Sequence, residues 1–215
     1  MKVAPSILSA DFGHLGDEII AVEKSGADWI HLDVMDGHFV PNLTFGPLVI
    51  KAIRPLSSLF FDVHLMISNP ENLLQDFLES GADLITIHFE ATSVLDSIID
   101  KVKTAGKKIG ISVKPKTKIE SIKPFLDKID LILIMSVEPG WGGQKFMPKV
   151  LEKAKKLKAW REQNSKIFHY IIEIDGGINN KNILDVKKSG VDVVVAGSYI
   201  FKNNNYADAI STLKK

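Results

Sequence analysis

Cysteine is absent from the 215-residue chain, which excludes disulfide bonds, a thiol nucleophile and thiolate metal sites. Any bound metal ion must therefore be held by imidazole and carboxylate groups. Arginine is nearly absent as well, because Arg54 and Arg161 are its only two occurrences. A phosphate site in this chain would depend on lysine side chains or on backbone N–H groups.

The sequence also has no apolar run near the roughly 20 residues that cross a bilayer. Its N-terminal residues lack the cationic and apolar regions of a secretory signal. The 27 basic and 26 acidic residues nearly cancel, so no overall field favours nucleic acid or an anionic membrane. We therefore expect a cytoplasmic protein that binds neither nucleic acid nor membrane.

Short β-branched runs alternate with longer amphipathic stretches along the whole chain, a pattern typical of repeated βα units around a parallel sheet. Strands are expected near residues 3–8, 28–34, 59–65, 83–88, 108–113, 130–136, 168–175 and 191–196. Helices are expected roughly at residues 14–25, 45–54, 70–80, 93–105, 118–126, 148–163, 179–189 and 206–213. Asn69 and Pro70 are expected to begin the third helix as its N-cap and first residue.

An internal repeat supports eight units. The segments 25–28, 80–83 and 189–192 share the pattern Ser-Gly-x-Asp, and their spacings of 55 and 109 residues are close to two and four units. We predict a single-domain (β/α)₈ TIM barrel that spans residues 1–215. The alternative is an open doubly wound sheet, which would show a glycine-rich G-x-G-x-x-G after the first strand; residues 5–12 contain none.

Polar side chains cluster toward the carboxyl ends of three predicted strands, where a barrel carries its chemistry. Side chains alternate along a strand, so the residues at every second position share one face. We expect the face that carries the polar residues to point into the barrel. The sets are His31, Asp33 and Met35; Asp62, His64 and Met66; and Glu173 and Asp175.

Two imidazoles and two carboxylates in such a cluster suit one divalent ion such as Zn²⁺, Fe²⁺, Mn²⁺ or Co²⁺. Burying two carboxylates without a cation would be costly. A metal-free hydrogen-bond network is the alternative. The other four histidines, His14, His38, His88 and His169, have no comparable neighbours and are expected to be surface, loop or core residues; His88 is the first exception to consider, because it also ends a strand.

Glycine-rich segments follow the last three predicted strands and indicate a phosphate site made of backbone N–H groups. They contain Gly140, Trp141, Gly142 and Gly143 after the sixth strand, Gly176 and Gly177 after the seventh, and Gly197 and Ser198 after the eighth.

Together these segments resemble the signature segments of the ribulose-phosphate 3-epimerase family. The resemblance lies in residues 5–11, 31–42, 62–66, 135–146 and 175–177, and it spans nearly the whole chain. It implies a (β/α)₈ barrel isomerase that interconverts D-ribulose 5-phosphate and D-xylulose 5-phosphate in the pentose phosphate pathway.

The resemblance also implies roles for individual residues. His31, Asp33, His64 and Asp175 would ligate a catalytic divalent metal, and Asp33 and Asp175 would transfer the protons. The substrate and its phosphate would contact Ser6, His64, Gly140, Trp141, Gly142, Gly143, Asp175, Gly176, Gly177, Gly197 and Ser198. Met35, Met66 and Met135 would surround the reacting carbons. Trp141 stands where the family often has phenylalanine.

The chemistry of epimerisation requires such a set. Inverting a carbon beside a ketone removes a proton from one face and returns one to the other, so two acid–base groups must flank the substrate. A divalent ion would stabilise the ene-diolate that forms between these steps. Two alternatives stay open: an epimerase of a six-carbon ketose phosphate such as D-allulose 6-phosphate, and a non-catalytic phosphate-binding barrel. We also expect a homo-oligomer, either a dimer or a hexamer.

Overall fold

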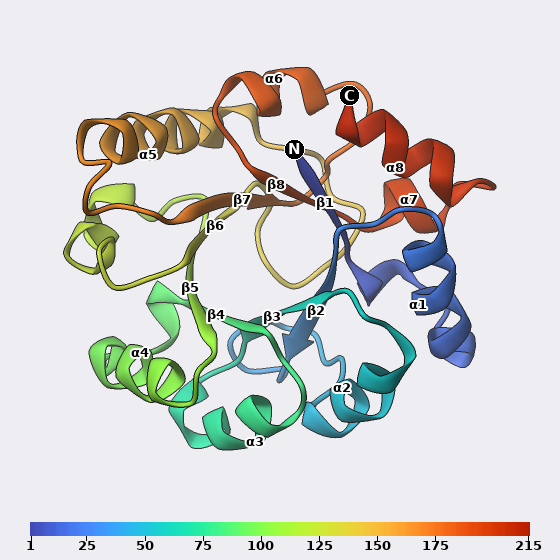
Figure 1. Cartoon of the computed structure of the whole chain (residues 1–215), viewed down its shortest axis with the longest axis horizontal. Helices are drawn as coiled ribbons and strands as arrows, with labels where there is room; N and C mark the ends of the chain where they lie inside the picture. The colour runs from blue at the N-terminus through green and yellow to red at the C-terminus, as the bar shows by residue number, and fades with distance from the viewer.

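Eight parallel strands curve into a barrel in the computed structural model, which describes residues 1–215 (Figure 1). The strands are β1 (Lys2–Pro5), β2 (Trp29–Met35), β3 (Phe60–Met66), β4 (Leu84–His88), β5 (Lys108–Val113), β6 (Leu131–Met135), β7 (Ile171–Asp175) and β8 (Val193–Ala196). From β2 to β8 each strand pairs with its sequence neighbour, and β1 pairs with β8. A parallel bridge between Ser6 and His31 joins β1 to β2. This consecutive order confirms the barrel and excludes the doubly wound alternative, whose strand order reverses.

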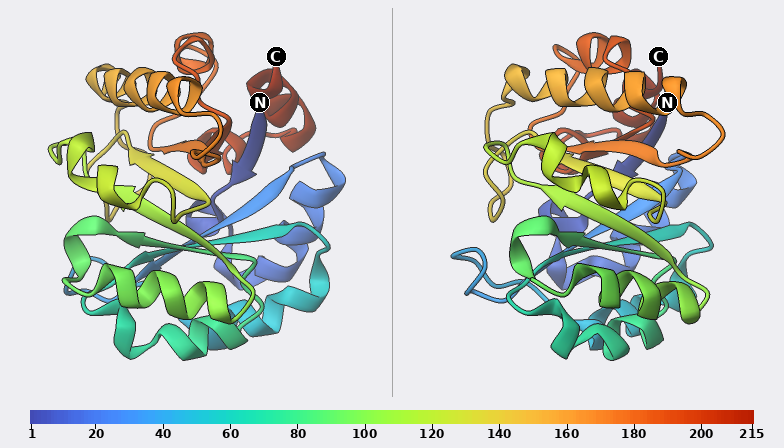
Figure 2. Two further views of the ribbon diagram at one scale, coloured as in Figure 1. Left: turned by 60° about the vertical axis from the view of Figure 1, so that its left-hand side comes forward. Right: turned by 90° about the vertical axis from the view of Figure 1, so that its left-hand side faces the viewer.

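The helices form an outer ring around these strands, as the side views show (Figure 2). The α-helices are α1 (Leu15–Lys24), α2 (Pro47–Ile53), α3 (Leu74–Glu79), α4 (Leu95–Thr104), α5 (Leu151–Gln163), α6 (Ile183–Lys188), α7 (Ser198–Phe201) and α8 (Tyr206–Lys214). Short 3₁₀ helices are η1 (Ile7–Ser9), η2 (Phe12–His14), η3 (Arg54–Leu56), η4 (Pro70–Asn72), η5 (Phe89–Ala91), η6 (Ile119–Phe125) and η7 (Pro148–Val150). None of these helices combines the length and the apolar character that a membrane span requires.

All eight predicted strands are present, but some predicted boundaries are wrong. The first strand ends at Pro5 rather than near residue 8, because the chain turns into η1. The predicted helix 118–126 is the 3₁₀ helix η6; Pro124 lies inside it and has no N–H for an α-helical hydrogen bond. Asn69 and Pro70 are the N-cap and first residue of the 3₁₀ helix η4, but Asn69 has a left-handed backbone and makes no side-chain cap, and α3 begins only at Leu74. The short helix α7 was not predicted at all.

The Ser-Gly-x-Asp repeat has a structural cause at the amino ends of the strands. Each aspartate accepts a hydrogen bond from the backbone N–H of a residue at or near the start of the neighbouring strand: Asp28 from Val3, Asp83 from Phe61 and Asp192 from Ile172, all at 2.8 Å. The two arginines bind two of these carboxylates, Arg54 to Asp83 and Arg161 to Asp192. Both arginines therefore stabilise the end of the barrel opposite the predicted site.

Two apolar cores hold the barrel together. A cluster of 50 buried residues lies between the strands and the helices, and includes the outward side chains of β2, Ile30, Leu32 and Val34. A second cluster of nine residues fills part of the barrel interior, with Leu133 and Met135 of β6 among them. The rest of the interior is polar: β2 to β5 and β7 bury histidine, acidic and hydroxyl side chains there. Such groups are costly to bury without partners, so the interior itself indicates a functional site.

Gly110 on β5 leaves room for this polar interior. A Cβ atom at Gly110 would overlap Oγ1 of Thr86 and lie 3.1 Å from Cδ2 of Leu131. We expect Gly110→Ala to lower the free energy of unfolding by about 1–3 kcal/mol, because a filled core resists an added methyl group. Urea denaturation followed by far-UV circular dichroism measures this. Gly142→Ala is the control, since its Cβ would lie 3.5 Å from the nearest side chain; an equal loss in both variants would contradict the packing argument.

Candidate active site

The predicted cluster of imidazoles and carboxylates is present at the carboxyl ends of the strands. His31 and Asp33 lie on β2, His64 on β3 and Asp175 on β7, and one ligand-type atom from each lies within 4.8 Å of the others. The alternation of side chains brings the β2 and β3 residues to the same side of the sheet. The closure of the barrel then brings β7 to them. The four side chains are therefore placed as a single potential metal-binding group.

His31 is oriented by an acidic neighbour below the site. Its Nδ1 lies 2.5 Å from Oδ2 of the buried Asp62. Its Nε2 faces the other three residues and lies 3.3 Å from Oδ1 of Asp33, yet this buried atom has no hydrogen-bond partner. With Asp62 accepting the Nδ1 proton, Nε2 is the atom directed toward the cluster.

His64 is oriented from its other side. Its Nδ1 lies 3.2 Å from Oδ1 of Asp33, and its Nε2 lies 3.0 Å from Nε2 of His88. His88, which ends β4, thus contacts one member of the cluster and is the exception among the other four histidines. His31, His64 and His88 are fully buried.

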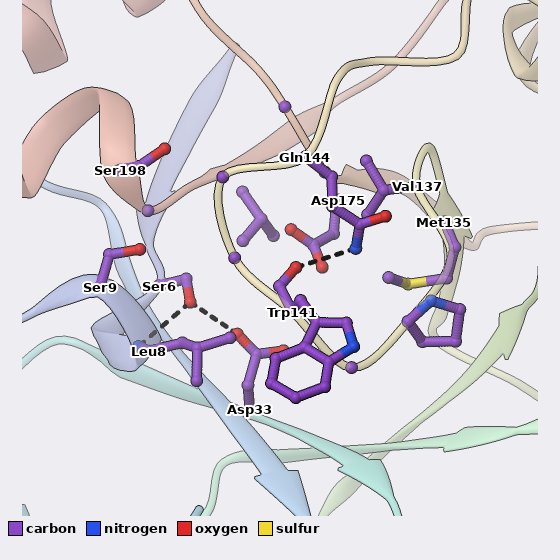
Figure 3. Close-up of a pocket in the computed structure, with 18 of the residues that line it drawn as sticks. Ser6, Leu8, Ser9, Asp33, Met135, Val137, Trp141, Gln144, Asp175 and Ser198 are labelled. Carbon is purple, nitrogen blue, oxygen red and sulfur yellow. Dashed lines mark hydrogen bonds between the residues drawn. The ribbon is translucent and has the colours of Figure 1, made fainter. Parts of the chain in front are cut away.

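The two carboxylates experience different surroundings. Burial opposes ionisation of Asp33, but His31 and His64 outweigh it and hold the pKa of Asp33 below its usual range. Burial, and then the nearby charge of Asp33, raise the pKa of Asp175 to about 7. Ser6 donates a hydrogen bond to Oδ2 of Asp33 at 2.5 Å, drawn in Figure 3. The pair of carboxyl groups is thus placed where one cation would favour ionisation of both.

A pocket opens above this cluster (Figure 3). Its lining contains nearly all the residues predicted to contact substrate: Ser6, Gly140, Trp141, Gly142, Gly143, Asp175, Gly176, Gly177, Gly197 and Ser198. Asp33, predicted as a metal ligand and proton-transfer group, also lines it. The three predicted methionines, Met35, Met66 and Met135, line it too. His64 does not line the pocket but lies fully buried beneath it. The structure thus places His64 beside the carboxylates rather than in the open part of the pocket.

Two of the glycine loops touch each other across the pocket. Gly177 has a φ of +67°, and a Cβ atom on it would lie 2.6 Å from both the carbonyl oxygen of Gln144 and the amide nitrogen of Phe146. Ser136 ties the same loops together by donating to the carbonyl of Gly176 at 2.7 Å. Asn42 adds a bond from the β2 loop to the carbonyl of Gly140 at 2.8 Å. The position of the β6 loop over the pocket therefore depends on glycine at position 177.

Sequence reasoning missed two polar residues of the pocket, Ser9 and Gln144. Ser6 and Ser9 lie three residues apart at the 3₁₀ helix η1, where residues at this spacing share a face. The predicted strand through residue 8 concealed this spacing. Gln144 donates to the carbonyl oxygens of Glu138 and Trp141 at 2.6 and 3.0 Å and so shapes the β6 loop around the half-exposed Trp141.

The fold and this site together define a (β/α)₈-barrel enzyme with paired carboxylates at the carboxyl ends of its strands. Residues 2–201 match the model of the family described as the ribulose-phosphate 3 epimerase family. The chain belongs to the ribulose-phosphate 3-epimerase family and is an epimerase of the isomerase class.

Curated relatives are similar in sequence to this chain over almost its full length. The ribulose-phosphate 3-epimerase of Synechocystis sp. is 48% identical over 214 residues, which cover 99% of this chain and 92% of the relative. The ribulose-phosphate 3-epimerase of Bacillus subtilis is 46% identical over 214 residues, covering 100% of this chain and 98% of the relative. The chloroplastic enzyme of Arabidopsis thaliana is 45% identical and is covered to 75% of its length.

Solved structures of distant sequence share the fold. KGPDC from Streptococcus mutans in complex with D-R5P superposes with a TM-score of 0.75 at 16% identity, covering 99% of this chain and 94% of that one. The 3-hexulose-6-phosphate synthase from Salmonella typhimurium gives a TM-score of 0.71 at 20% identity, covering 99% and 96%. At such low identity these likenesses support the barrel fold alone.

Contact between the glycine loops generates a prediction for catalysis. We expect Gly177→Ala to lower kcat/KM for ribulose 5-phosphate by about 10²-fold, because the new methyl group displaces the β6 loop and a shift of about 1 Å has that effect. A coupled epimerase assay measures it. Gly143→Ala is the matched control: its φ of +74° is also positive, but its Cβ would meet nothing within 4 Å. Equal losses in the two variants would show that backbone strain, not the loop contact, is responsible.

Proposed function

We propose that Asp33 and Asp175 are the two proton-transfer groups of the epimerase. One carboxylate removes the proton from C3 of ribulose 5-phosphate, and the other returns a proton to the opposite face, which gives xylulose 5-phosphate. The observation that supports this is the meeting of two carboxyl groups from β2 and β7 at the floor of one pocket. The curated relatives are named for ribulose phosphate, which favours the five-carbon substrate over a six-carbon one.

The state of the two carboxyl groups supports this pairing. Asp33 is held ionised by its histidine neighbours, whereas the pKa of Asp175 is raised to about 7 by burial and by Asp33. Two such groups titrate as a coupled pair, so one can hold a proton while the other accepts one. Ser6 keeps the Asp33 carboxylate in place through its hydrogen bond to Oδ2.

We further propose that His31, Asp33, His64 and Asp175 hold one divalent metal ion. The fit is supported by the orphaned Nε2 atom of His31, which is buried and aimed at the other three residues. Two imidazoles and two carboxylates accept Zn²⁺, Fe²⁺, Mn²⁺ or Co²⁺, and the donor set does not choose among them. Such an ion supplies Lewis-acid stabilisation of the negative charge that develops on the ketone oxygen of the substrate.

The glycine loops after β6, β7 and β8 bind the phosphate in this proposal. Gly142, Gly143, Gly176, Gly177 and Gly197 line the pocket and carry no Cβ, so an anion can approach their backbone N–H groups closely, and Ser198 would add its N–H group at the start of α7. Both arginines lie elsewhere, in ion pairs with Asp83 and Asp192. Met35, Met66 and Met135 provide an apolar wall that adapts to a planar intermediate. The whole chain, residues 1–215, forms this catalytic unit; a homo-oligomer and the lack of nucleic-acid binding stay predictions.

Asp175→Asn tests the proton-transfer role. We expect kcat to fall by about 10²–10⁴-fold, because an amide cannot exchange the proton. Entry of solvent deuterium into C3 of ribulose 5-phosphate, followed by NMR, should fall with it while the circular dichroism spectrum is unchanged. Glu138→Gln is the control, since Glu138 is exposed on the β6 loop and does not line the pocket. Undiminished exchange in Asp175→Asn would remove Asp175 from the reaction.

Metal removal tests the second part. We expect dialysis against a chelator to lower epimerase activity at least about tenfold and added divalent ion to restore it, because the site would lose its Lewis acid. Elemental analysis of the protein as purified identifies the ion in the same experiment. Full activity in protein shown to be free of metal would contradict the metal site and leave the two-carboxylate proposal standing.

A further inference from the structure

Ser9 lies at the wall of the pocket between two of the glycine loops. A Cβ atom at Gly197 would lie 2.6 Å from Oγ of Ser9, and one at Gly142 would lie 3.5 Å from it. Gly142 belongs to the loop after β6, and Gly197 to the loop after β8. In Figure 3 the hydroxyl of Ser9 points toward the interior of the pocket, which Ser9 lines. One hydroxyl group therefore lies beside both loops.

Backbone pairing between β1 and β8 places Ser9 there. In this pair Pro5 lies opposite Ala196. The N–H of Ser6 continues the pairing by donating to the carbonyl of Ala196 at 3.1 Å. The N–H of Ser9 then donates to the carbonyl of Ser6 at 3.3 Å within η1. Because these bonds use only the backbone, the hydroxyl of Ser9 is held against the β8 loop without being needed for the turn.

The hydroxyl of Ser9 has no hydrogen-bond partner within the protein, unlike that of Ser6, which donates to Asp33. The neighbouring Gly197 has a φ of −96°, so no left-handed backbone accounts for glycine at this position. The space that a side chain at position 197 would fill is occupied by Oγ of Ser9 instead. The pocket wall thus presents one unpaired hydroxyl group at a position where a larger side chain on the β8 loop would displace it.

A phosphate group in this pocket has to be bound by neutral donors. Asp33 and Asp175 are the only charged residues of the lining, and both are acidic. Their charge repels an anion, so the phosphate is expected to lie away from them and against the glycine loops. A hydroxyl group donates to an anion as an N–H group does, and a hydrogen bond to an ionised acceptor is roughly twice as strong as a neutral one.

We propose that the hydroxyl of Ser9 donates a hydrogen bond to the phosphate group of the substrate, from the wall between the β6 and β8 loops. This inference rests on the proposed function, in which these loops bind the phosphate. Ser9 then contributes to the preference for a phosphorylated sugar. Ser6, three residues earlier, contacts the acid–base end of the pocket through Asp33. The two serines of this one turn thus serve opposite ends of the substrate.

Ser9→Ala tests the proposal through binding, which needs no turnover. Ribitol 5-phosphate has no ketone and cannot be epimerised, so calorimetry gives its Kd directly. We expect this Kd to rise about 10–100-fold, because a hydrogen bond to a charged group is lost. The inhibition constant of inorganic phosphate in the epimerase assay should rise about tenfold or more. KM for ribulose 5-phosphate should rise with them while kcat stays within about threefold, since the reacting end is unaltered.

Ser68→Ala is the matched control. Ser68 follows β3 at the same end of the barrel and is partly buried, as Ser9 is. Its backbone N–H donates to Asp36, its hydroxyl has no hydrogen-bond partner, and it does not line the pocket. Both variants lose one hydroxyl group, so circular dichroism should show the same folded protein. In Ser68→Ala we expect both phosphate-binding constants to stay within about twofold.

The outcomes separate the inference from the proposed function. Unchanged binding of ribitol 5-phosphate and inorganic phosphate in Ser9→Ala would overturn the inference. A fall in kcat with unchanged inhibition by inorganic phosphate would overturn it too, because Ser9 would then shape the reacting end of the pocket. Equal losses in Ser9→Ala and Ser68→Ala would show a general effect of lost hydroxyl groups and do the same. Unaltered protein that binds neither phosphate compound would instead contradict the phosphate site of the proposed function.

Discussion

Burial of like charges in one small space is the constraint on which the rest of this structure depends. Asp33 and Asp175 meet at the floor of the pocket, the first buried and the second partly buried, and the charge of Asp33 raises the cost of ionising Asp175. The surrounding groups compensate: His31 and His64 approach Asp33, and Ser6 donates to it. Two buried carboxylates that can exchange one proton are a poor arrangement for stability and a suitable one for moving protons at carbon.

The barrel separates the tasks of stability and catalysis. At the amino ends of the strands, aspartates such as Asp83 and Asp192 accept backbone N–H groups and pair with the two arginines. At the carboxyl ends, the glycine loops line the pocket with backbone rather than with side chains. Strong, satisfied ion pairs therefore lie far from the site. In the polar interior, by contrast, several buried side-chain atoms, Nε2 of His31 among them, have no hydrogen-bond partner.

Residues that orient the imidazoles lie outside the pocket lining and are part of the site as well. The second ring nitrogen of a metal-binding histidine is commonly hydrogen-bonded, which fixes the orientation of the ring. Nδ1 of His31 contacts Asp62, and Nε2 of His64 contacts His88, which contacts Glu90 in turn. Membership of the ribulose-phosphate 3-epimerase family names the reaction. The residues that contact His31 and His64 from outside the pocket determine how the two imidazole rings are oriented in this chain.

The alternation of side chains along single strands was enough to predict which polar residues enter the barrel. Alternation along β2 and β3 assigned His31, Asp33 and His64 to the interior, because that period of two is a property of each strand alone. Distances between strands were decided only by the tertiary structure, since lateral pairing and barrel closure are non-local and bring Asp175 of β7 to the β2 residues. The contact between His64 and His88 likewise depended on the pairing of β3 with β4, which no local pattern contains.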